Sequence, residues 1–305
     1  MRMRLLSILA GAAAVAAAPL AAAAAAQSDR AVVVIASHDA PPYLQASTGI
    51  QRIVAPHRQG RTLQGASLEM SERAVDEAVR NAGPDAILVA LGANALEYLR
   101  AKGENQSMIA CMVLDSGDLA GVTLRPLAQT RLERMHAVLP DVKVVGLLYG
   151  ARQDRPYVER FIRIGEKMGF QFIARMAGDE NDPRQIAPWS ANAIDAIITM
   201  YDTRLNSPRI VQHLLQYSLR NRIPLIGLSD AWTKAGALLS LDWDFADLGE
   251  QCGLIVLDVL RGADPANLGV AGPRKVIYSI NLRTANYLRL TIPTEQLKNA
   301  RHIFE

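Results

Sequence analysis

Side chains that could bind a small molecule stand directly after short apolar runs of this 305-residue chain. Asp202 and Asp230 offer carboxylates, and tyrosine and tryptophan rings offer flat apolar walls with polar edges. Residues 92–94 precede an expected helix, whose first N–H groups could hold a carboxylate. The chemistry indicated is non-covalent recognition. The candidate binding residues are Ser37, His38, Tyr43, Gly92, Ala93, Asn94, Tyr149, Tyr201, Asp202, Asp230, Trp232 and Trp243.

Each candidate also has a structural interpretation. Asp202 could cap the helix that is expected to follow it, because a carboxylate oxygen accepts the first N–H groups of a helix, and Asp230 is a similar but weaker case. The aromatic rings could pack an interface between lobes instead of lining a pocket. The sequence leaves both interpretations open.

Motifs that would indicate catalysis are missing from the sequence. It contains no G-x-S-x-G elbow, H-E-x-x-H pair, P-loop or G-x-G-x-x-G. Its five histidines are scattered, and no His/Cys spacing suits a metal ion. We therefore expect a binding protein with no catalytic residue, no metal and no cofactor. The alternative is an enzyme on a binding-protein-like fold, which turnover assays on esters and phosphates would reveal.

The apolar runs predict the elements that position the candidate residues. They are short, continuous and rich in Val and Ile, as is typical of strands buried on both faces of a parallel sheet. Helical patterns lie between most of them, so we expect an α/β fold with two Rossmann-like lobes. Ligands of such sheets bind outside the carboxyl ends of the strands. The runs are residues 32–36, 86–91, 144–148, 193–200, 224–228 and 238–241.

Two local features carry further expectations. Pro41 and Pro42 are expected to interrupt any helix directly after the first strand. The two cysteines, Cys111 and Cys252, lie in apolar surroundings that favour buried free thiols, with one disulfide as the alternative. Because a chain of this length can bury a large core, any such bridge is expected to be dispensable.

The first 26 residues are expected to be a secretory signal peptide. Arg2 and Arg4 precede an apolar stretch over residues 5–18, and residues 21–26 offer small-residue cleavage sites. The stretch is too short and too rich in Ala for a good membrane span. No Cys lies near the cleavage point to carry a lipid anchor, so we expect a soluble periplasmic protein.

The exported protein is therefore expected to begin near Gln27, because the small residues before it suit signal peptidase. N-terminal sequencing of the exported chain is the measurement. An intact Met1 on that chain would contradict the prediction.

The charge balance excludes two classes of partner. Residues 1–26 hold two of the 33 basic residues and none of the 30 acidic ones, so the mature chain is nearly neutral. This balance provides no electrostatic basis for binding nucleic acid or an anionic membrane.

The last third of the chain resembles a known family. Residues 241–251, 259–265, 280–285 and 290–295 resemble the successive patterns D-y-x-d-L-G, i-L-x-G-x-x-P, i-N-l-x-t-A and G-l-t-I-P. These patterns are similar to those of the ABC-transporter substrate-binding proteins whose best-known members bind aromatic amino acids. Weaker matches upstream extend the resemblance over most of residues 30–300.

The resemblance implies a type I periplasmic-binding fold, in which two lobes close on a ligand about a hinge. Three crossing segments would fall near residues 114–122, 241–244 and 280–282. The first lobe would hold residues 27–118 and 243–279. The second lobe would hold residues 119–242 and 280–305.

The resemblance also implies a function. The chain would be the periplasmic component of an ABC importer, a monomer that captures an amino-acid-like solute and delivers it to a permease in the inner membrane. The family position matching Asp202 pairs with the ligand ammonium, so Asp202 and residues 92–94 would recognise a zwitterion. The family commonly has Gly-Thr-Pro-Ala at residues 92–95, and here Asn94 would replace the threonine hydroxyl. The alternative is a periplasmic sensor that reports to a membrane kinase or receptor.

Overall fold

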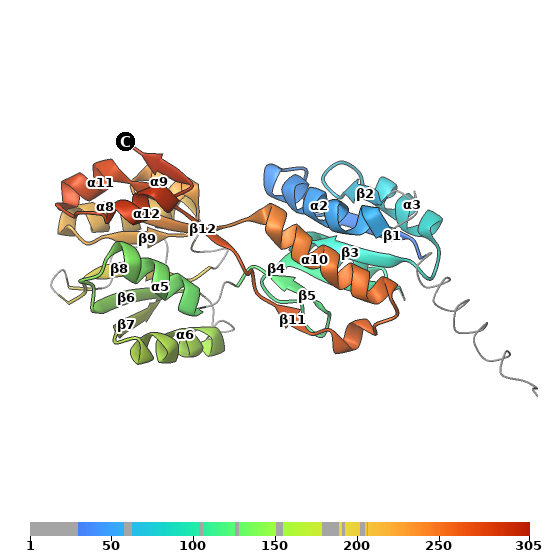
Figure 1. Cartoon of the computed structure of the whole chain (residues 1–305), viewed down its shortest axis with the longest axis horizontal. Coiled ribbons are helices and arrows are strands. Elements are labelled where there is room, and N and C mark those ends of the chain that lie inside the picture. The colour runs from blue at the N-terminus through green and yellow to red at the C-terminus, as the bar shows by residue number, and fades with distance from the viewer. Residues whose placement is uncertain are drawn as a thin grey trace, which may run out of the picture. The chain divides into compact units, whose positions relative to one another are not determined.

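The chain forms two compact α/β units in the computed structural model, each assembled from separate stretches of sequence (Figure 1). Unit 1 consists of the chain up to Val122 together with Gly249–Ala271. Unit 2 consists of Thr123–Leu248 and Gly272–Glu305. The expected signal peptide lies outside the described residues. The structure describes residues 30–57, 63–103, 106–125, 128–150, 155–178, 189–190, 193–201, 205 and 207–305.

Unit 1 is built on a sheet whose strands follow the order β11-β5-β4-β3-β1-β2. β1 pairs in parallel with β2 and with β3, and β3 pairs in parallel with β4. Val34, Val89 and Ile109 are therefore neighbours across three strands, and all are buried. The strands are β1 (Val32–Ala36), β2 (Gln64–Ser67), β3 (Ile87–Leu91), β4 (Ser107–Val113), β5 (Gly121–Thr123) and β11 (Val270–Ala271).

Helices cover both faces of this sheet. α3 and α4 share a buried cluster with alternate strand residues, including Val33, Leu88 and Ala110. Side chains alternate across a strand, so Cys111 points to the opposite face, where α10 lies (Figure 1). The helices are α2 (Pro41–Val54), η1 (Ala55–His57), α3 (Glu72–Ala82), α4 (Ala93–Ala101), η3 (Pro265–Asn267) and α10 (Phe245–Leu260), which enters the unit at Gly249.

Unit 2 is built on a second sheet with the order β13-β12-β10-β9-β8-β6-β7. Its strands pair in parallel except β10 and β12, which are antiparallel. Ile198 packs in the core cluster shared with α5 and α6, and its neighbour Ile197 packs in the cluster shared with α8. The strands are β6 (Val144–Tyr149), β7 (Gln171–Met176), β8 (Ala196–Thr199), β9 (Leu225–Gly227), β10 (Leu239–Trp243), β12 (Val276–Asn281) and β13 (His302–Phe304).

The helices of unit 2 complete its layers. None of the helices in the described stretches is long and apolar enough to cross a membrane. The helices are α5 (Ala128–Val138), α6 (Arg155–Lys167), α8 (Pro208–Asn221), α9 (Asp230–Ala235), α11 (Leu282–Leu288) and α12 (Thr294–Asn299).

The α/β class predicted from the apolar runs is confirmed, since each of the six runs overlaps a strand of a largely parallel sheet. The expectation for Pro41 and Pro42 is wrong, because α2 begins at Pro41. Proline is tolerated in the first turn of a helix, where its missing N–H would have no partner. The short helix α9 was not predicted from the sequence.

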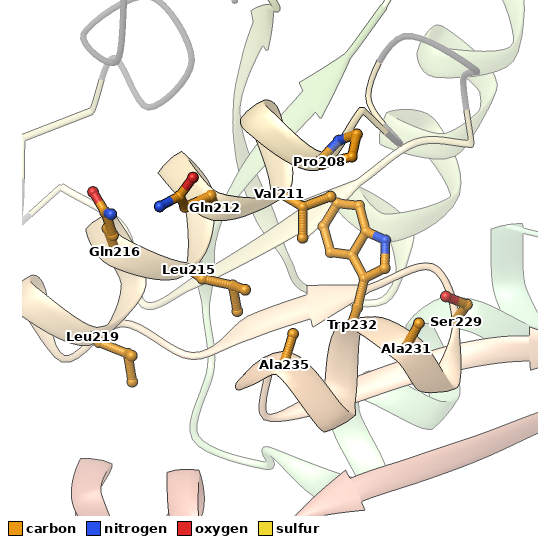
Figure 2. A pocket seen from close by; sticks show the side chains of 10 residues that line it. All are labelled: Pro208, Val211, Gln212, Leu215, Gln216, Leu219, Ser229, Ala231, Trp232 and Ala235. Atoms are coloured by element: carbon orange, nitrogen blue, oxygen red, sulfur yellow. The ribbon is translucent and has the colours of Figure 1, made fainter.

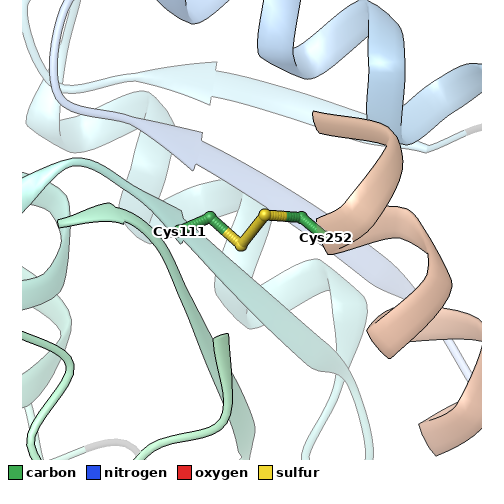
Figure 3. The surroundings of a disulfide bond; sticks show 2 residues. All are labelled: Cys111 and Cys252. Atoms are coloured by element: carbon green, nitrogen blue, oxygen red, sulfur yellow. A yellow bond between two sulfur atoms is a disulfide. The ribbon is translucent and has the colours of Figure 1, made fainter. Parts of the chain in front are cut away.

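The interpretation of the cysteines as free thiols is also wrong. Cys111 on β4 and Cys252 on α10 form a disulfide, with their Cα atoms 6.4 Å apart (Figure 3). Both side chains are buried, as expected. Their pairing depends on α10 lying over β4, a contact between residues 141 positions apart that the local sequence does not indicate.

Candidate ligand-binding site

Most of the candidate residues of unit 1 gather at the carboxyl edge of its sheet. β1 lies between β3 and β2, so the chain crosses from one side of β1 to the other between the second strand and the third. This is a topological switch point, the place where open α/β sheets bind ligands. Ser37 and His38 follow β1, residues 92–94 follow β3, and Glu69 follows β2.

Ser37 and Gly92 form the floor of this site. The Ser37 side chain is 3% exposed, and its Oγ accepts the Ala95 N–H at 2.9 Å, which caps α4 from a neighbouring strand. Gly92 has a φ of +93°, and a Cβ there would lie 2.6 Å from Ser37 Oγ and 2.8 Å from the Tyr43 ring. A glycine is therefore required for the chain to pass between these two side chains.

Some of the backbone N–H groups at the start of α4 already have hydrogen-bond acceptors within the protein. The Ala95 N–H is bonded to Ser37, and the Leu96 N–H is bonded to the Gly92 carbonyl at 3.2 Å. The carboxylate site expected at residues 92–94 would therefore depend on the N–H groups of Ala93 and Asn94.

His38 connects three side chains at the rim of the site. Its Nε2 lies 3.4 Å from Asn94 Nδ2, its Nδ1 lies 3.6 Å from Glu69 Oε2, and its ring centroid lies 5.5 Å from that of Tyr43. The amide of Asn94 is a donor, so this arrangement suits a tautomer with its proton on Nδ1, facing Glu69. Burial raises the pKa of the Tyr43 hydroxyl, which therefore stays protonated as a donor.

A pocket of about 580 Å³ opens beside these residues. Its size falls within the range of small-molecule sites. Three carboxylates line it and His38 is the only basic side chain among the described lining residues, so its electrostatic character favours a positively charged group. The lining residues are Ser37, His38, Leu68, Glu69, Glu72, Asn94, Glu97, Tyr98 and Ala101.

Two candidate aromatics of unit 2 meet at the carboxyl edge of its own sheet. Tyr201 follows β8 and Trp243 ends β10, and their rings pack edge to face with centroids 4.8 Å apart. The Trp243 ring is 6% exposed, and its Nε1 has no hydrogen-bond partner within the described residues. Tyr149, at the end of β6, packs against the core cluster shared with α5 and α6.

Asp230 begins α9, and the structure pairs it with the C-terminal strand. Its Oδ2 contacts Nδ1 of His302, the first residue of β13. Its backbone N–H lies 3.4 Å from Oδ2 of Asp242, whose Oδ1 accepts the Trp243 N–H at 2.8 Å. Burial raises the pKa of Asp242, and these two N–H groups offset part of the increase by stabilising the carboxylate.

Trp232 lies apart from the other candidates of unit 2. Its side chain is 2% exposed and packs in the core between α8 and α9, where it forms one wall of an apolar groove (Figure 2). The structure thus joins Tyr201 to Trp243 but places Trp232 on the helical face. Asp202 lies outside the described residues, and its expected role stays a prediction.

Sequence reasoning missed the acidic residues of the unit 1 pocket. Glu69 precedes α3, Glu72 is its first residue, and Glu97 lies on α4 one turn after Asn94. Nothing in their local sequence distinguishes them from surface glutamates. The order of β2 and β1 in the sheet would have indicated Glu69, because it brings both strand ends to one edge. Within the described residues, no group of three or more His, Cys, Asp or Glu could hold a metal ion.

Several solved structures share the fold of this chain. An ABC domain in complex with L-Trp from Streptococcus pneumonia is 23% identical, with a TM-score of 0.61, and the match covers 90% of this chain and 100% of that chain. A substrate-binding protein with adhesive properties from Clostridium difficile is 14% identical, with a TM-score of 0.68 and coverage of 90% and 99%. A periplasmic ribose ABC transporter protein from Conexibacter woesei is 13% identical, with a TM-score of 0.54 and coverage of 89% and 98%. The chain therefore has the type I periplasmic-binding fold.

The family follows from the sequence match. Residues 106–304 match the family model described as ABC transporter substrate binding protein, and the chain belongs to this family. The family is one of non-catalytic binding proteins, which implies a small-molecule ligand and a permease partner. No curated protein sequence matches the chain significantly.

Proposed function

We propose that this chain is the periplasmic substrate-binding component of an ABC-type importer, exported by its N-terminal signal peptide. It captures a small amino-acid-like solute between its two units by hinge closure and acts as a monomer. The acid-lined pocket at the switch point of unit 1 carries the proposal. Aromatic amino acids are the first candidates, because Tyr43 in unit 1 and Tyr201 in unit 2 are partly exposed aromatic rings at the carboxyl edges of the two sheets.

The acidic lining suggests how the solute is oriented. A ligand ammonium in this pocket would face Glu69 and Glu97, while a ligand carboxylate there would be repelled by them. The proposed orientation places the ammonium in unit 1. It reverses the arrangement expected from the sequence, in which unit 1 holds the carboxylate.

Identification of the bound solute is the decisive experiment. Mass spectrometry of small molecules released from the unfolded protein should detect an amine-containing solute, and calorimetry should confirm its binding. L-tryptophan, tryptamine and indole-3-propionate then form a matched probe set, because tryptamine lacks the carboxylate and the propionate lacks the amine. The proposal fails if no amino-acid-like compound co-purifies and none binds.

The substitution Glu69→Gln tests the role of the pocket. It keeps the shape of the side chain and the acceptor for the Asp39 N–H, but removes the charge. Because Glu69 is more than half exposed, we expect affinity for the amine-containing solute to fall only about fivefold to tenfold. Calorimetry is the measurement, and Glu133→Gln on α5 is the control. Equal affinities for the two variants would exclude Glu69 from the site.

Uptake assays separate the importer from the sensor. Cells that lack this chain should lose uptake of the identified solute. Normal uptake combined with loss of a transcriptional response to the solute would support the sensor instead.

A further inference from the structure

His38 stands among carboxylates at the rim of the unit 1 pocket. Its side chain is 47% exposed and that of Glu69 is 56% exposed, so a solute can reach both groups. Three glutamates line the pocket, and among its described lining residues His38 is the only side chain that ordinarily changes its charge between about pH 5 and 8. The net charge that a solute meets in this pocket therefore depends on the protonation of His38.

The contacts of His38 fit the neutral imidazole. Its Nε2 lies 3.4 Å from Nδ2 of Asn94, which is a donor, so Nε2 acts as an acceptor without a proton. The single proton is then on Nδ1, which lies 3.6 Å from Glu69 Oε2. A second proton would make Nε2 a donor that faces another donor. The observed position of the Asn94 amide therefore favours the neutral ring.

A protonated His38 and a solute ammonium would compete for one carboxylate. Glu69 Oε2 accepts the Asp39 N–H at 2.8 Å and faces His38, whereas Oε1 accepts no hydrogen bond from the described residues. An ammonium at Oε1 would be stabilised by the full charge of Glu69 only while His38 is neutral. An imidazolium 3.6 Å from Oε2 would neutralise much of that charge and would also repel the ammonium.

The other groups around His38 do not offset this change. No Lys or Arg is among the described residues that line the pocket, so nothing else there supplies a positive charge. Burial raises the pKa of both tyrosines near His38, so their hydroxyls stay neutral. The titratable side chains around His38 are Tyr43 on α2, Glu72 on α3, Glu97 and Tyr98 on α4, and Asp39 and Glu69 in the loops after β1 and β2.

We propose that His38 makes the capture of an ammonium-bearing solute sensitive to pH, so that the solute binds while His38 is neutral and is released when His38 is protonated. This inference rests on the proposed function, which places the solute ammonium beside Glu69. The sign follows from the competition, because affinity is complete above the range in which His38 titrates and declines as the pH falls through that range. Binding within this range expels the proton from His38.

Calorimetry with L-tryptophan tests the inference. Lowering the pH from about 7.5 to about 5.5 should weaken binding about threefold to tenfold, because the charges are partly exposed and therefore screened. Near pH 6.5 binding should release a fraction of a proton, up to about one, measured as the difference in heat between buffers of different ionisation enthalpy. His38→Gln keeps an acceptor for the Asn94 amide but cannot become charged, so the pH dependence and the proton release should both disappear. His38→Asn is the second variant if the first does not bind.

His57→Gln is the matched control, because His57 is an exposed histidine of the same unit and does not line the pocket. It should retain the pH dependence of the unsubstituted chain, and its loss in this variant would overturn the inference. Binding that does not depend on pH would also overturn it, as would an equal fall in His38→Gln, which would assign the effect to the glutamates. These three results leave the proposed function intact. Absence of L-tryptophan binding at both pH values would instead reject the proposed aromatic amino-acid solute, and the inference falls with it.

Discussion

Loss of the Cys111–Cys252 bridge is expected to lower the free energy of unfolding of unit 1 by about 3–5 kcal/mol. The bridge closes a loop of 141 residues, and loop-closure entropy in the unfolded chain grows with loop length. It also joins the two separate stretches of unit 1, because Cys111 on β4 belongs to the first stretch and Cys252 on α10 belongs to the second. Urea unfolding followed by circular dichroism, with and without reductant, measures the effect.

The double variant Cys111→Ala/Cys252→Ala is the control. It should show the lower stability in both conditions and no response to the reductant. A change of less than about 1 kcal/mol would support the sequence-based expectation that the bridge is dispensable, because the core then suffices to hold α10 in place.

The substitution Gly249→Ala is expected to lower the free energy of unfolding by about 3 kcal/mol. Gly249 lies on α10 where this helix touches α2, and a Cβ there would overlap the Ala46 carbonyl oxygen and lie 2.7 Å from its carbonyl carbon. The obstacle is backbone, so no side chain can rotate to make room, and the two helices must separate. Chemical denaturation of the variant measures the loss.

Gly65→Ala is the matched control, because a Cβ at Gly65 has nothing within 4 Å. Its effect should stay within about 0.5 kcal/mol. The α2 helix also carries Tyr43, so Gly249→Ala should weaken solute binding as well as stability. Equal stability of the two variants would show that the contact between α2 and α10 relaxes at little cost.

The strands and their tips were predictable from the sequence because both depend on local patterns. A run such as residues 86–91 is apolar throughout and ends at a glycine, which indicates a strand buried on both faces and followed by a turn. The family resemblance of residues 241–295 also has a physical basis, which in one case is a contact between distant helices. Gly249, one of its positions, is the glycine at which α10 meets α2.

The composition of the site was not predictable, because it depends on which strands are neighbours. Glu69 reaches His38 only because β2 lies beside β1, and Ser37 caps α4 only because β1 lies beside β3. The alternation of strands and helices is compatible with several strand orders. The acidic character of the pocket follows from this one order.

The sequence by itself determined the α/β class, the six strand tips and the family. These rest on periodicity and motifs, which act over a few residues. Only the tertiary structure decided that Cys111 meets Cys252, that Asp230 pairs with His302, and that Trp232 faces α8. The physical reason is that each contact depends on how separate elements pack against one another. Local sequence patterns do not specify that packing.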